Sequence, residues 1–174
     1  YFCTMLKLIF GRIWAVWGII WFALTALLIM PFVLASNYAK EPFRSNSFYT
    51  LSRIWMQMFL PLVGCPLKVR GKEHFAPGEN YVVVCNHNSF MDVPLSSPFI
   101  PAANRTIAKK DFMKIPIFNQ IYKRGSVLVD RKSEVSRRKS FDDMKQVLAN
   151  GWHMCIYPEG TRNKSNEPLQ AFKD

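Results

Sequence analysis

The first third of the chain carries two apolar segments that predict two helices. Residues 13–35 include no charged side chain, and about 20 apolar residues are enough for a helix to cross the hydrocarbon core of a bilayer. A polar connector over residues 36–47 leads to a second apolar segment at residues 48–63, where Arg53 and Gln57 share one helical face. We expect the second helix to lie in the membrane interface or to pair with the first. Together they would form a membrane-embedded hairpin with both ends on one side.

The same apolar start is compatible with two other interpretations. A signal peptide would end at Val33-Leu34-Ala35, although the run is longer than the apolar core of a usual signal peptide. A soluble protein would instead bury both segments as core helices. Basic residues occur on both sides of the first segment, so the positive-inside rule gives no orientation. They are Lys7 and Arg12 before it, and Lys40, Arg44 and Arg53 after it.

After Gly64-Cys65-Pro66 the pattern changes to short apolar runs that alternate with amphipathic segments. The apolar runs predict strands at residues 67–70, 81–85, 106–108, 126–129 and 152–157, the run at 81–84 being a buried strand. The amphipathic segments predict helices at residues 92–98, 111–122 and 133–149. Pro116 interrupts the second helix and Ser133 caps the third. The apolar positions of the third helix are Phe141, Met144, Val147 and Leu148.

Because strands and helices alternate, we expect an α/β sheet in the second part of the chain. The predicted domains are a membrane-associated helical hairpin over residues 1–64 and an α/β domain over residues 65–174.

The chain is strongly basic, with 23 Lys and Arg, 12 Asp and Glu and a net charge of +11. The charge concentrates in the later part, at Lys109, Lys110, Lys114, Lys123, Arg124, Arg131, Lys132, Arg137, Arg138 and Lys139. Such a patch suits an anionic lipid surface or a phosphorylated substrate. A nucleic-acid partner is disfavoured, because the sequence has no zinc-finger spacing or recognisable RNA-binding motif and its aromatic residues cluster at the apolar end.

The four cysteines are widely separated and form no C-x-x-C sequence. Cys3, Cys65, Cys85 and Cys155 are therefore predicted to be reduced residues of the core. Cys85 also lies two positions before His87, which allows a thiol nucleophile activated by a histidine as a second interpretation. A thiol that ends an apolar strand more commonly serves packing.

The strand at residues 81–85 leads to the first candidate for chemistry, His87, with Asp92 five positions later. In one continuous helix these side chains would point about 140° apart. If His87 lies in a loop and Asp92 opens a helix, the carboxylate can fold back onto the imidazole. Asp92 would then fix the tautomer and leave the other ring nitrogen free to take a proton. The ordinary alternative is a loop histidine beside a helix cap, formed by Asp92 alone or by Ser89 and Asp92 as a capping box.

Two other predicted strands also end in polar residues. Gly125 precedes the strand at 126–129 and Asp130-Arg131 follows it, and an arginine can donate two parallel hydrogen bonds to a phosphate. The strand at 152–157 is followed by Pro158-Glu159-Gly160-Thr161-Arg162, in which the glycine permits close approach of the backbone to a ligand. A surface ion pair and a tight turn are the ordinary alternatives.

Three blocks thus occur in order at strand ends: N-H-x-x-x-x-D at 86–92, G-x-x-x-x-D-R at 125–131 and P-E-G-T-R at 158–162. This combination resembles the glycerolipid acyltransferase family, most closely the bacterial 1-acylglycerol-3-phosphate (lysophosphatidic acid) acyltransferases. The resemblance covers roughly residues 67–174, and the apolar start is similar to the two-helix membrane motif of short bacterial members. The family's fourth block is not found before Asp174, so we expect the C-terminal part of the domain to be missing from this sequence.

The resemblance implies transfer of an acyl group from a thioester to a glycerol hydroxyl, yielding phosphatidic acid. By the family pattern His87 would be the general base and Asp92 its orienting partner. The residues implied in the acceptor and glycerol phosphate site are Gly125, Arg131, Glu159, Gly160, Thr161 and Arg162. Lys109 and Lys110 are further candidates for an anionic cleft.

The same resemblance implies acyl-coenzyme A or acyl-carrier protein as co-substrate, membrane lipids as partners, and no cofactor, metal or nucleic acid. We expect a location at the cytoplasmic face of a bacterial inner membrane. The sequence has no G-x-S-x-G elbow, so direct attack by the acceptor is expected rather than an acyl-enzyme, with Ser89 a loop residue and not a nucleophile. The acceptor would alternatively be glycerol 3-phosphate or another lysolipid.

Two interpretations of another class remain beside this one. In the first, His87, Asp92 and Glu159 would hold the catalytic metal of a membrane-bound phosphohydrolase. In the second, the protein would be a membrane-anchored binder of anionic lipid or nucleic acid that uses its basic patch and catalyses nothing.

Overall fold

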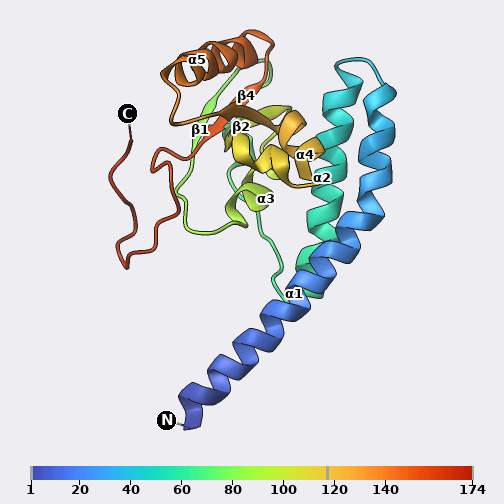
Figure 1. Cartoon of the computed structure of the whole chain (residues 1–174). Helices are drawn as coiled ribbons and strands as arrows, with labels where there is room; N and C mark the ends of the chain where they lie inside the picture. The colour runs from blue at the N-terminus through green and yellow to red at the C-terminus, as the bar shows by residue number, and fades with distance from the viewer. Residues whose placement is uncertain (1, 117, 174) are drawn as a thin grey trace.

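The computed structural model describes residues 2–116 and 118–173, and contains a four-stranded sheet, its flanking helices and two long N-terminal helices (Figure 1). The strands are β1 (Val82–Val84), β2 (Asn104–Lys109), β3 (Ser126–Val129) and β4 (His153–Ile156). The α-helices are α1 (Phe2–Ala35), α2 (Phe43–Leu62), α3 (Asp92–Ser96), α4 (Phe118–Gly125) and α5 (Glu134–Ala149). Short 3₁₀ helices are η1 (Ser36–Tyr38), η2 (Lys72–His74), η3 (Ser97–Phe99) and η4 (Lys110–Lys114).

The sheet has the strand order β1-β4-β2-β3, and every strand pair in it is parallel. Val83 pairs with Cys155, Thr106 with Cys155 and Ile107 with Val127. The predicted α/β fold is therefore confirmed. Because the strands are parallel, all four carboxyl ends lie at one edge of the sheet, where open α/β sheets commonly bind ligands.

The two faces of the sheet are covered by different helices. Val127 and Met154 pack with Val147 of α5 in one apolar cluster. On the other face Asn104 and Cys155 contact Ser97 and Ser96, which belong to η3 and α3. Strand β1, at the edge of the sheet, has no such cover from α5.

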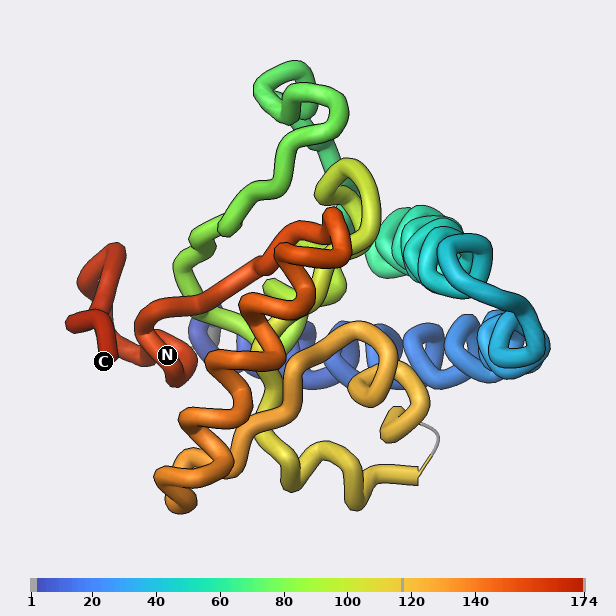
Figure 2. Tube along the Cα trace, turned by 90° about the horizontal axis from the view of Figure 1, so that it is seen from above, coloured from blue at the N-terminus to red at the C-terminus, as the bar shows by residue number. Residues whose placement is uncertain are grey.

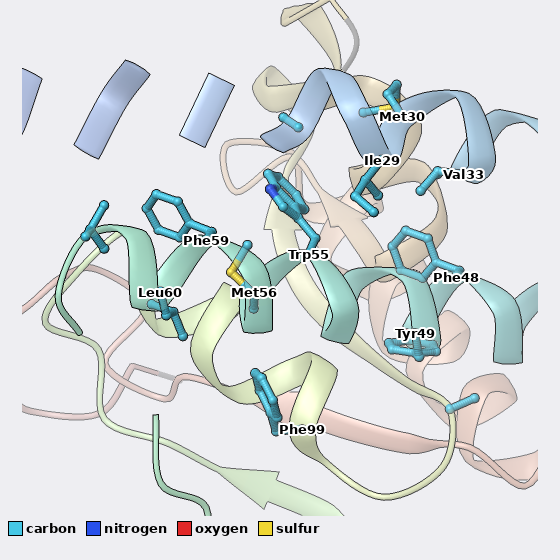
Figure 3. Packing of buried hydrophobic residues seen from close by; sticks show 13 residues of the cluster. Ile29, Met30, Val33, Phe48, Tyr49, Trp55, Met56, Phe59, Leu60 and Phe99 are labelled. Carbon is cyan, nitrogen blue, oxygen red and sulfur yellow. The ribbon is translucent and has the colours of Figure 1, made fainter. Parts of the chain in front are cut away.

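The N-terminal helices α1 and α2 pair with each other, which is one of the two arrangements expected for the second apolar segment. The indole nitrogens of Trp14 and Trp17 each donate to a carbonyl near the end of α2 at 3.0 Å, and Trp55 of α2 donates to Thr25 of α1 at 2.9 Å. Helix α2 also packs against η3 through Phe99, in the cluster that Figure 3 shows. One apolar core thus extends across the predicted domain boundary at residue 64.

Helix α1 alone, within the described part of the chain, is long and apolar enough to cross a membrane. Its most apolar 18-residue window, in Cys3–Tyr38, has a mean hydropathy of 2.3 and is 28% buried, a test that buried core helices and signal sequences also pass. In Figure 1 the N-terminal half of α1 projects beyond the rest of the molecule, whereas α2 lies between α1 and the sheet. A membrane segment of two helices is therefore not confirmed.

Several predicted elements have different bounds or surroundings. Residues 67–70 form no strand, and Leu67 and Val69 are partly exposed. The run at 81–84 is a strand but not a buried one, since Val82 and Val84 of β1 are 51% and 57% exposed. The reason is tertiary: β1 is an edge strand, and α5 packs on β3 and β4.

The predicted helices and cysteines need similar corrections. The helix at 92–98 is divided between α3 and η3, and that at 111–122 between η4 and α4. Ser133 does cap α5, its hydroxyl accepting from Ser136 N–H at 3.2 Å, but Phe141 is 60% exposed and lies outside the core. Cys155 is buried and Cys85 half-buried, while the two remaining cysteines, Cys3 and Cys65, are exposed and so were wrongly assigned to the core.

Candidate active site

The loop between β1 and α3 brings His87 and Asp92 together. His87 Nδ1 lies 2.8 Å from Asp92 Oδ2, and both side chains are about one-fifth exposed. The same oxygen accepts the backbone N–H groups of Asn88 and Ser89 at 2.7 Å each. A carboxylate in this position accepts a hydrogen bond from Nδ1–H, so the other ring nitrogen, Nε2, carries the lone pair. The pairing that the five-residue spacing allowed is thus present.

Asp92 is not the N-cap of this loop, and the capping box of Ser89 with Asp92 is only half formed, by the bond from Ser89 N–H to the Asp92 carboxylate. Helix α3 has Met91 at its N-cap, with no side-chain hydrogen bond, and Asp92 is already the first helical residue. The hydroxyl of Ser89 accepts from Met91 N–H at 3.1 Å and not from the N–H of Asp92, as a capping box requires. Asp92 serves the loop and the imidazole instead.

The segment after β4 holds the backbone of His87 on both sides. Glu159 is 1% exposed, and its Oε1 accepts His87 N–H at 2.7 Å while its Oε2 accepts Gln170 N–H at 3.1 Å. Asn163 N–H donates to the carbonyl of His87. Sequence reasoning placed Glu159 among the phosphate ligands and missed Asn163, whose position in a polar turn carries no distinguishing signal. The structure gives Glu159 a different task, because both of its carboxylate oxygens accept from backbone amides.

Tyr157, the first residue after β4, lies against the imidazole of His87 with 4.7 Å between the ring centroids. Its hydroxyl is 2.6 Å from Ser96 Oγ, and burial raises the pKa of Tyr157. This residue was not predicted as part of the site. It covers one side of the ring that the loop positions.

Two thiols lie close to each other near this loop, Cys85 directly after β1 and Cys155 within the neighbouring strand β4. Cys85 Sγ is 3.9 Å from Cys155 Sγ, and this contact lowers the pKa of Cys85 to about 7 against the opposing effect of burial. The same contact, together with burial, raises the pKa of Cys155. Among the described contacts, Cys85 thus has a thiol as partner and no bond to the imidazole. The alternative of a Cys85 nucleophile activated by His87 has no support in this geometry.

The two predicted arginines, Arg131 and Arg162, both lie at the carboxyl edge of the sheet, beside the His87 loop or the Gly160 turn. Arg131, which follows β3, donates through Nη1 to the carbonyl of Gly160, which follows β4. This hydrogen bond connects the segments at the carboxyl ends of the two strands. The guanidinium carbon of Arg162 lies 3.5 Å from the ring centroid of Phe90, a residue of the His87 loop. Gly160 has φ +64°, and a Cβ there would meet Lys173 Cδ at 3.1 Å. Thr161, next to them, is exposed.

Gly125 is not part of this cluster. It ends α4 at the amino end of β3, and a Cβ built on it would lie 3.3 Å from the ring of Phe48 in α2. Strand β3 separates it from Arg131 by about 13 Å, at roughly 3.3 Å per residue. The acceptor role predicted for Gly125 therefore does not fit, and close packing of α4 against α2 accounts for the glycine. We also expected this glycine to open the strand at 126–129, but it is the last residue of α4 and β3 begins at Ser126.

The two candidate lysines end β2 at the same edge of the sheet. Lys109 is its last residue and is exposed, and Lys110 lines a cavity of about 660 Å³ between α5 and β3. Ser126, Leu128 and Lys139 also line this cavity, whereas no residue of the His87 loop does.

The metal interpretation finds no ligand set in the described part of the chain. No group of three or more His, Cys, Asp or Glu side chains is arranged there to hold a metal ion. Asp92 and Glu159 accept hydrogen bonds from N–H groups, and Glu159 turns toward the backbone of His87.

Comparison with known proteins agrees with this arrangement. The sequence model of the family described as "Acyltransferase" matches residues 66–174, more than half of the chain. The chain belongs to the acyltransferase family. The matched region contains the His87 loop, both arginines and the segment after β4.

Individual members resemble this acyltransferase-family chain over most of its length. It is 29% identical over 148 residues to the 1-acyl-sn-glycerol-3-phosphate acyltransferase of Cocos nucifera, covering 84% of this chain and 46% of that protein. The enzyme of the same name from Helicobacter pylori strain J99 is 28% identical over 152 residues, covering 87% of this chain and 62% of that protein. The chain thus spans about half to three-fifths of the length of these curated relatives.

A solved structure shows the same fold. The crystal structure of the 1-acyl-sn-glycerophosphate (LPA) acyltransferase PlsC from Thermotoga maritima superposes with a TM-score of 0.73 at 24% sequence identity. The match covers 93% of this chain and 67% of that one. At that coverage the match must include most of α1 and α2 as well as the sheet.

Proposed function

We propose that this acyltransferase-family protein transfers a fatty acyl group from a thioester to the free hydroxyl of 1-acylglycerol 3-phosphate, giving phosphatidic acid. The observation that carries the proposal is the 2.8 Å contact of His87 Nδ1 with Asp92 Oδ2 at the carboxyl edge of a parallel sheet. The names of the relatives supply the substrate class, and the three sequence blocks carry it over to this chain. A role for the protein in phospholipid synthesis follows.

His87 would act as the general base. With Nδ1–H donated to Asp92, Nε2 takes the proton of the acceptor hydroxyl as its oxygen attacks the thioester carbonyl. The carbon–sulfur bond then breaks, and the imidazolium returns the proton to the leaving thiolate. An alcohol is a weak nucleophile near neutral pH, and a positioned base contributes about 10²- to 10⁴-fold. Asp92 stabilises the imidazolium that forms in between.

Arg131 and Arg162 would hold the phosphate of the acceptor. Each carries a guanidinium that can make two parallel hydrogen bonds to phosphate oxygens, and each lies beside the His87 loop or the Gly160 turn. Gly160 lets the backbone approach the ligand, and Thr161 adds an exposed hydroxyl. Glu159 is left out of this phosphate site, because a buried carboxylate would repel the anion.

The donor would be acyl-coenzyme A or acyl-carrier protein, with no cofactor needed for the exchange. Donor chain, acceptor chain and product are lipids, so an enzyme at the membrane avoids extracting them into water. The exposed apolar surface of α1 supplies the membrane contact, and we propose the cytoplasmic face of a bacterial inner membrane as its place. Glycerol 3-phosphate or another lysolipid is the alternative acceptor.

The test is an acyl-transfer assay on purified protein containing this chain, with labelled lysophosphatidic acid and either acyl-coenzyme A or acyl-carrier protein. We expect His87→Ala to lower kcat by about 10²- to 10⁴-fold and Asp92→Asn to lower it strongly as well. His74→Ala is the matched control, because that histidine is exposed and its side chain contacts Glu73 and not the His87 loop. Equal rates for wild type and His87→Ala would remove the base assignment.

The same assay separates the enzyme from a membrane-anchored binder. A binder would keep its function in His87→Ala and lose it when Arg137, Arg138 and Lys139 are neutralised together. We expect the reverse order of severity, since these three side chains are exposed on α5 and make no contact with the His87 loop among the described hydrogen bonds.

A further inference from the structure

A second cluster of cations lies far from the His87 loop, at the amino edge of the sheet. It surrounds a cavity of about 250 Å³ where the α1–α2 connector meets α4 and the start of β2. Figures 1 and 2 place this connector and the segment after β4 on opposite sides of the molecule. The charged residues that line the cavity are Glu41, Arg44, Arg105, Lys123 and Arg124.

Arg124 is the cation with unused hydrogen-bonding capacity. Its Nη1 donates to the carbonyl of Val33 and to Ser36 Oγ, at 3.0 Å each. Its Nη2 is buried and has no acceptor among the described residues. A buried guanidinium N–H without an acceptor is unfavourable, and buried polar groups in proteins are normally satisfied. Arg124 lines the cavity, and an anion there would supply the acceptor once the guanidinium turns Nη2 toward it.

The other cations are only partly compensated. Arg44 pairs with the single carboxylate of the cavity, Glu41, at 2.8 Å. Arg105 has neutral partners, since it donates to Tyr49 OH at 3.0 Å and stacks 4.4 Å from the ring centroid of Trp152. Lys123 is exposed and forms no ion pair in the described structure.

The electrostatics agree with an excess of positive charge. Burial lowers the pKa of Arg124, and the charges of Arg44 and Arg105 act in the same direction, with Glu41 opposing them. Four cations therefore share one carboxylate around a cavity of head-group size.

We propose that this cavity is a second anion site that binds a phosphate group, held by Arg124, Arg105 and Lys123. Gln120 and Asn37 would add neutral donors from the wall. The site is separate from the phosphate site proposed at Arg131 and Arg162, because the length of β3, about 13 Å, lies between them. Its existence does not depend on the proposed acyl transfer.

The phosphate has two sources on chemical grounds. Tyr38 and Phe43, in and beside the connector, are 94% and 67% exposed, and Leu34 is 41% exposed, so a phospholipid headgroup can reach the cavity from a lipid surface. A soluble phosphate compound can reach it from water. Both present the same anion to the same donors.

The experiment uses Arg131→Gln/Arg162→Gln protein as background, so that the other proposed phosphate site is removed. One arm measures flotation with vesicles of phosphatidylcholine with and without phosphatidic acid. The other measures calorimetric binding of inorganic phosphate. In the arm that shows binding, we expect Lys123→Gln to weaken the affinity by about fivefold, which is the effect of losing one exposed ion contact. Arg124→Gln should weaken the affinity by roughly 10- to 100-fold.

Lys145→Gln is the matched control, an equal loss of charge on the exposed face of α5, and it should leave binding unchanged. Preference for phosphatidic acid vesicles assigns the site to lipid, and binding of inorganic phosphate assigns it to a soluble ligand. The proposal is overturned if neither arm shows binding, or if Lys123→Gln binds as well as the background protein. Because Arg124 also joins α4 to α1, Lys123→Gln decides the matter should Arg124→Gln fail to fold.

Discussion

Glu159 accepts the backbone N–H of His87 at 2.7 Å through a carboxylate that is 1% exposed, although the two residues are 72 positions apart in the chain. They follow β4 and β1, which are neighbours in the sheet, so the sheet itself brings them together. The block P-E-G-T-R thus contacts His87 through the backbone N–H of that histidine, which donates to the side chain of Glu159. A mutation in it would act on the position of the imidazole as well as on any phosphate.

The first prediction concerns Glu159→Gln. The amide offers one acceptor for the two N–H groups of His87 and Gln170, and its NH₂ would face the other N–H. We expect a loss of about 1–3 kcal/mol in the free energy of unfolding, the cost of a buried unsatisfied donor. In the acyl-transfer assay kcat should fall with little change in KM for the acceptor. Urea unfolding and steady-state kinetics measure both effects.

Thr161→Ala is the control for Glu159→Gln, since Thr161 is in the same turn but exposed. It should leave the free energy of unfolding within about 0.5 kcal/mol of wild type. A large rise in KM with unchanged kcat in Glu159→Gln would return that residue to the phosphate site and contradict the positioning role.

The second prediction concerns the reactivity of Cys85. Its pKa is lowered to about 7 by the contact with Cys155, so the thiol is protonated below pH 7 and deprotonated above it. The rate of alkylation by iodoacetamide should therefore rise with pH around a midpoint near 7, while buried Cys155, with its raised pKa, stays unmodified. Peptide mass spectrometry separates these cysteines from the exposed Cys3 and Cys65.

Cys85→Ser should retain acyl transfer, since the thiol has no bond to the imidazole in this structure. Loss of activity in that variant to the level of His87→Ala would favour the thiol nucleophile instead. A midpoint near the ordinary thiol value would show that the Cys155 contact does not persist in solution.

The third prediction concerns Gly160→Ala. The residue has φ +64°, a region that costs an L-residue about 1–2 kcal/mol, and the new Cβ would meet Lys173 Cδ at 3.1 Å and Arg131 Nη1 at 3.7 Å. We expect a lower free energy of unfolding and a higher KM for lysophosphatidic acid, because backbone strain in this turn moves the Gly160 carbonyl to which Arg131 donates. Thermal unfolding and kinetics provide the two readouts.

Gly78→Ala is the control that has the backbone strain of a positive φ without any new side-chain contact. Gly78 has φ +84°, and a Cβ on it would have nothing within 4 Å. It should show a similar loss of stability with an unchanged KM. Equal KM values for both variants would mean that Arg131 does not hold the acceptor.

The fourth prediction concerns the exposed surface of α1. Phe10 and Ile13 are 70% and 64% exposed, so Phe10→Asp and Ile13→Asp should weaken binding to phosphatidylcholine vesicles and leave the free energy of unfolding nearly unchanged. Phe59→Ala in α2, 5% exposed, should instead cost about 3–5 kcal/mol of stability. Vesicle flotation and urea unfolding measure the two quantities, and undiminished flotation of both aspartate variants would remove α1 as the membrane contact.

Much of the architecture was predictable because local pattern decides it. The strand at 126–129, the cap at Ser133 and the helix–strand alternation follow from residue periodicity and from short-range hydrogen bonding, which act over a few residues. The possible pairing of His87 with Asp92 was likewise a matter of five positions in one loop. These features need no knowledge of what lies elsewhere in the chain.

Tertiary structure decided the rest, because it depends on which distant segments become neighbours. Only the strand order makes β1 an exposed edge and turns Glu159 toward the peptide groups of His87, and only the packing of α4 on α2 sets Gly125 against Phe48. The same holds for Arg124, which in the sequence is one basic residue among many, and whose Nη2 is buried only because α4 packs against α1. Residue types set the local elements and the chemistry available, and packing across the sheet selects which of those groups meet.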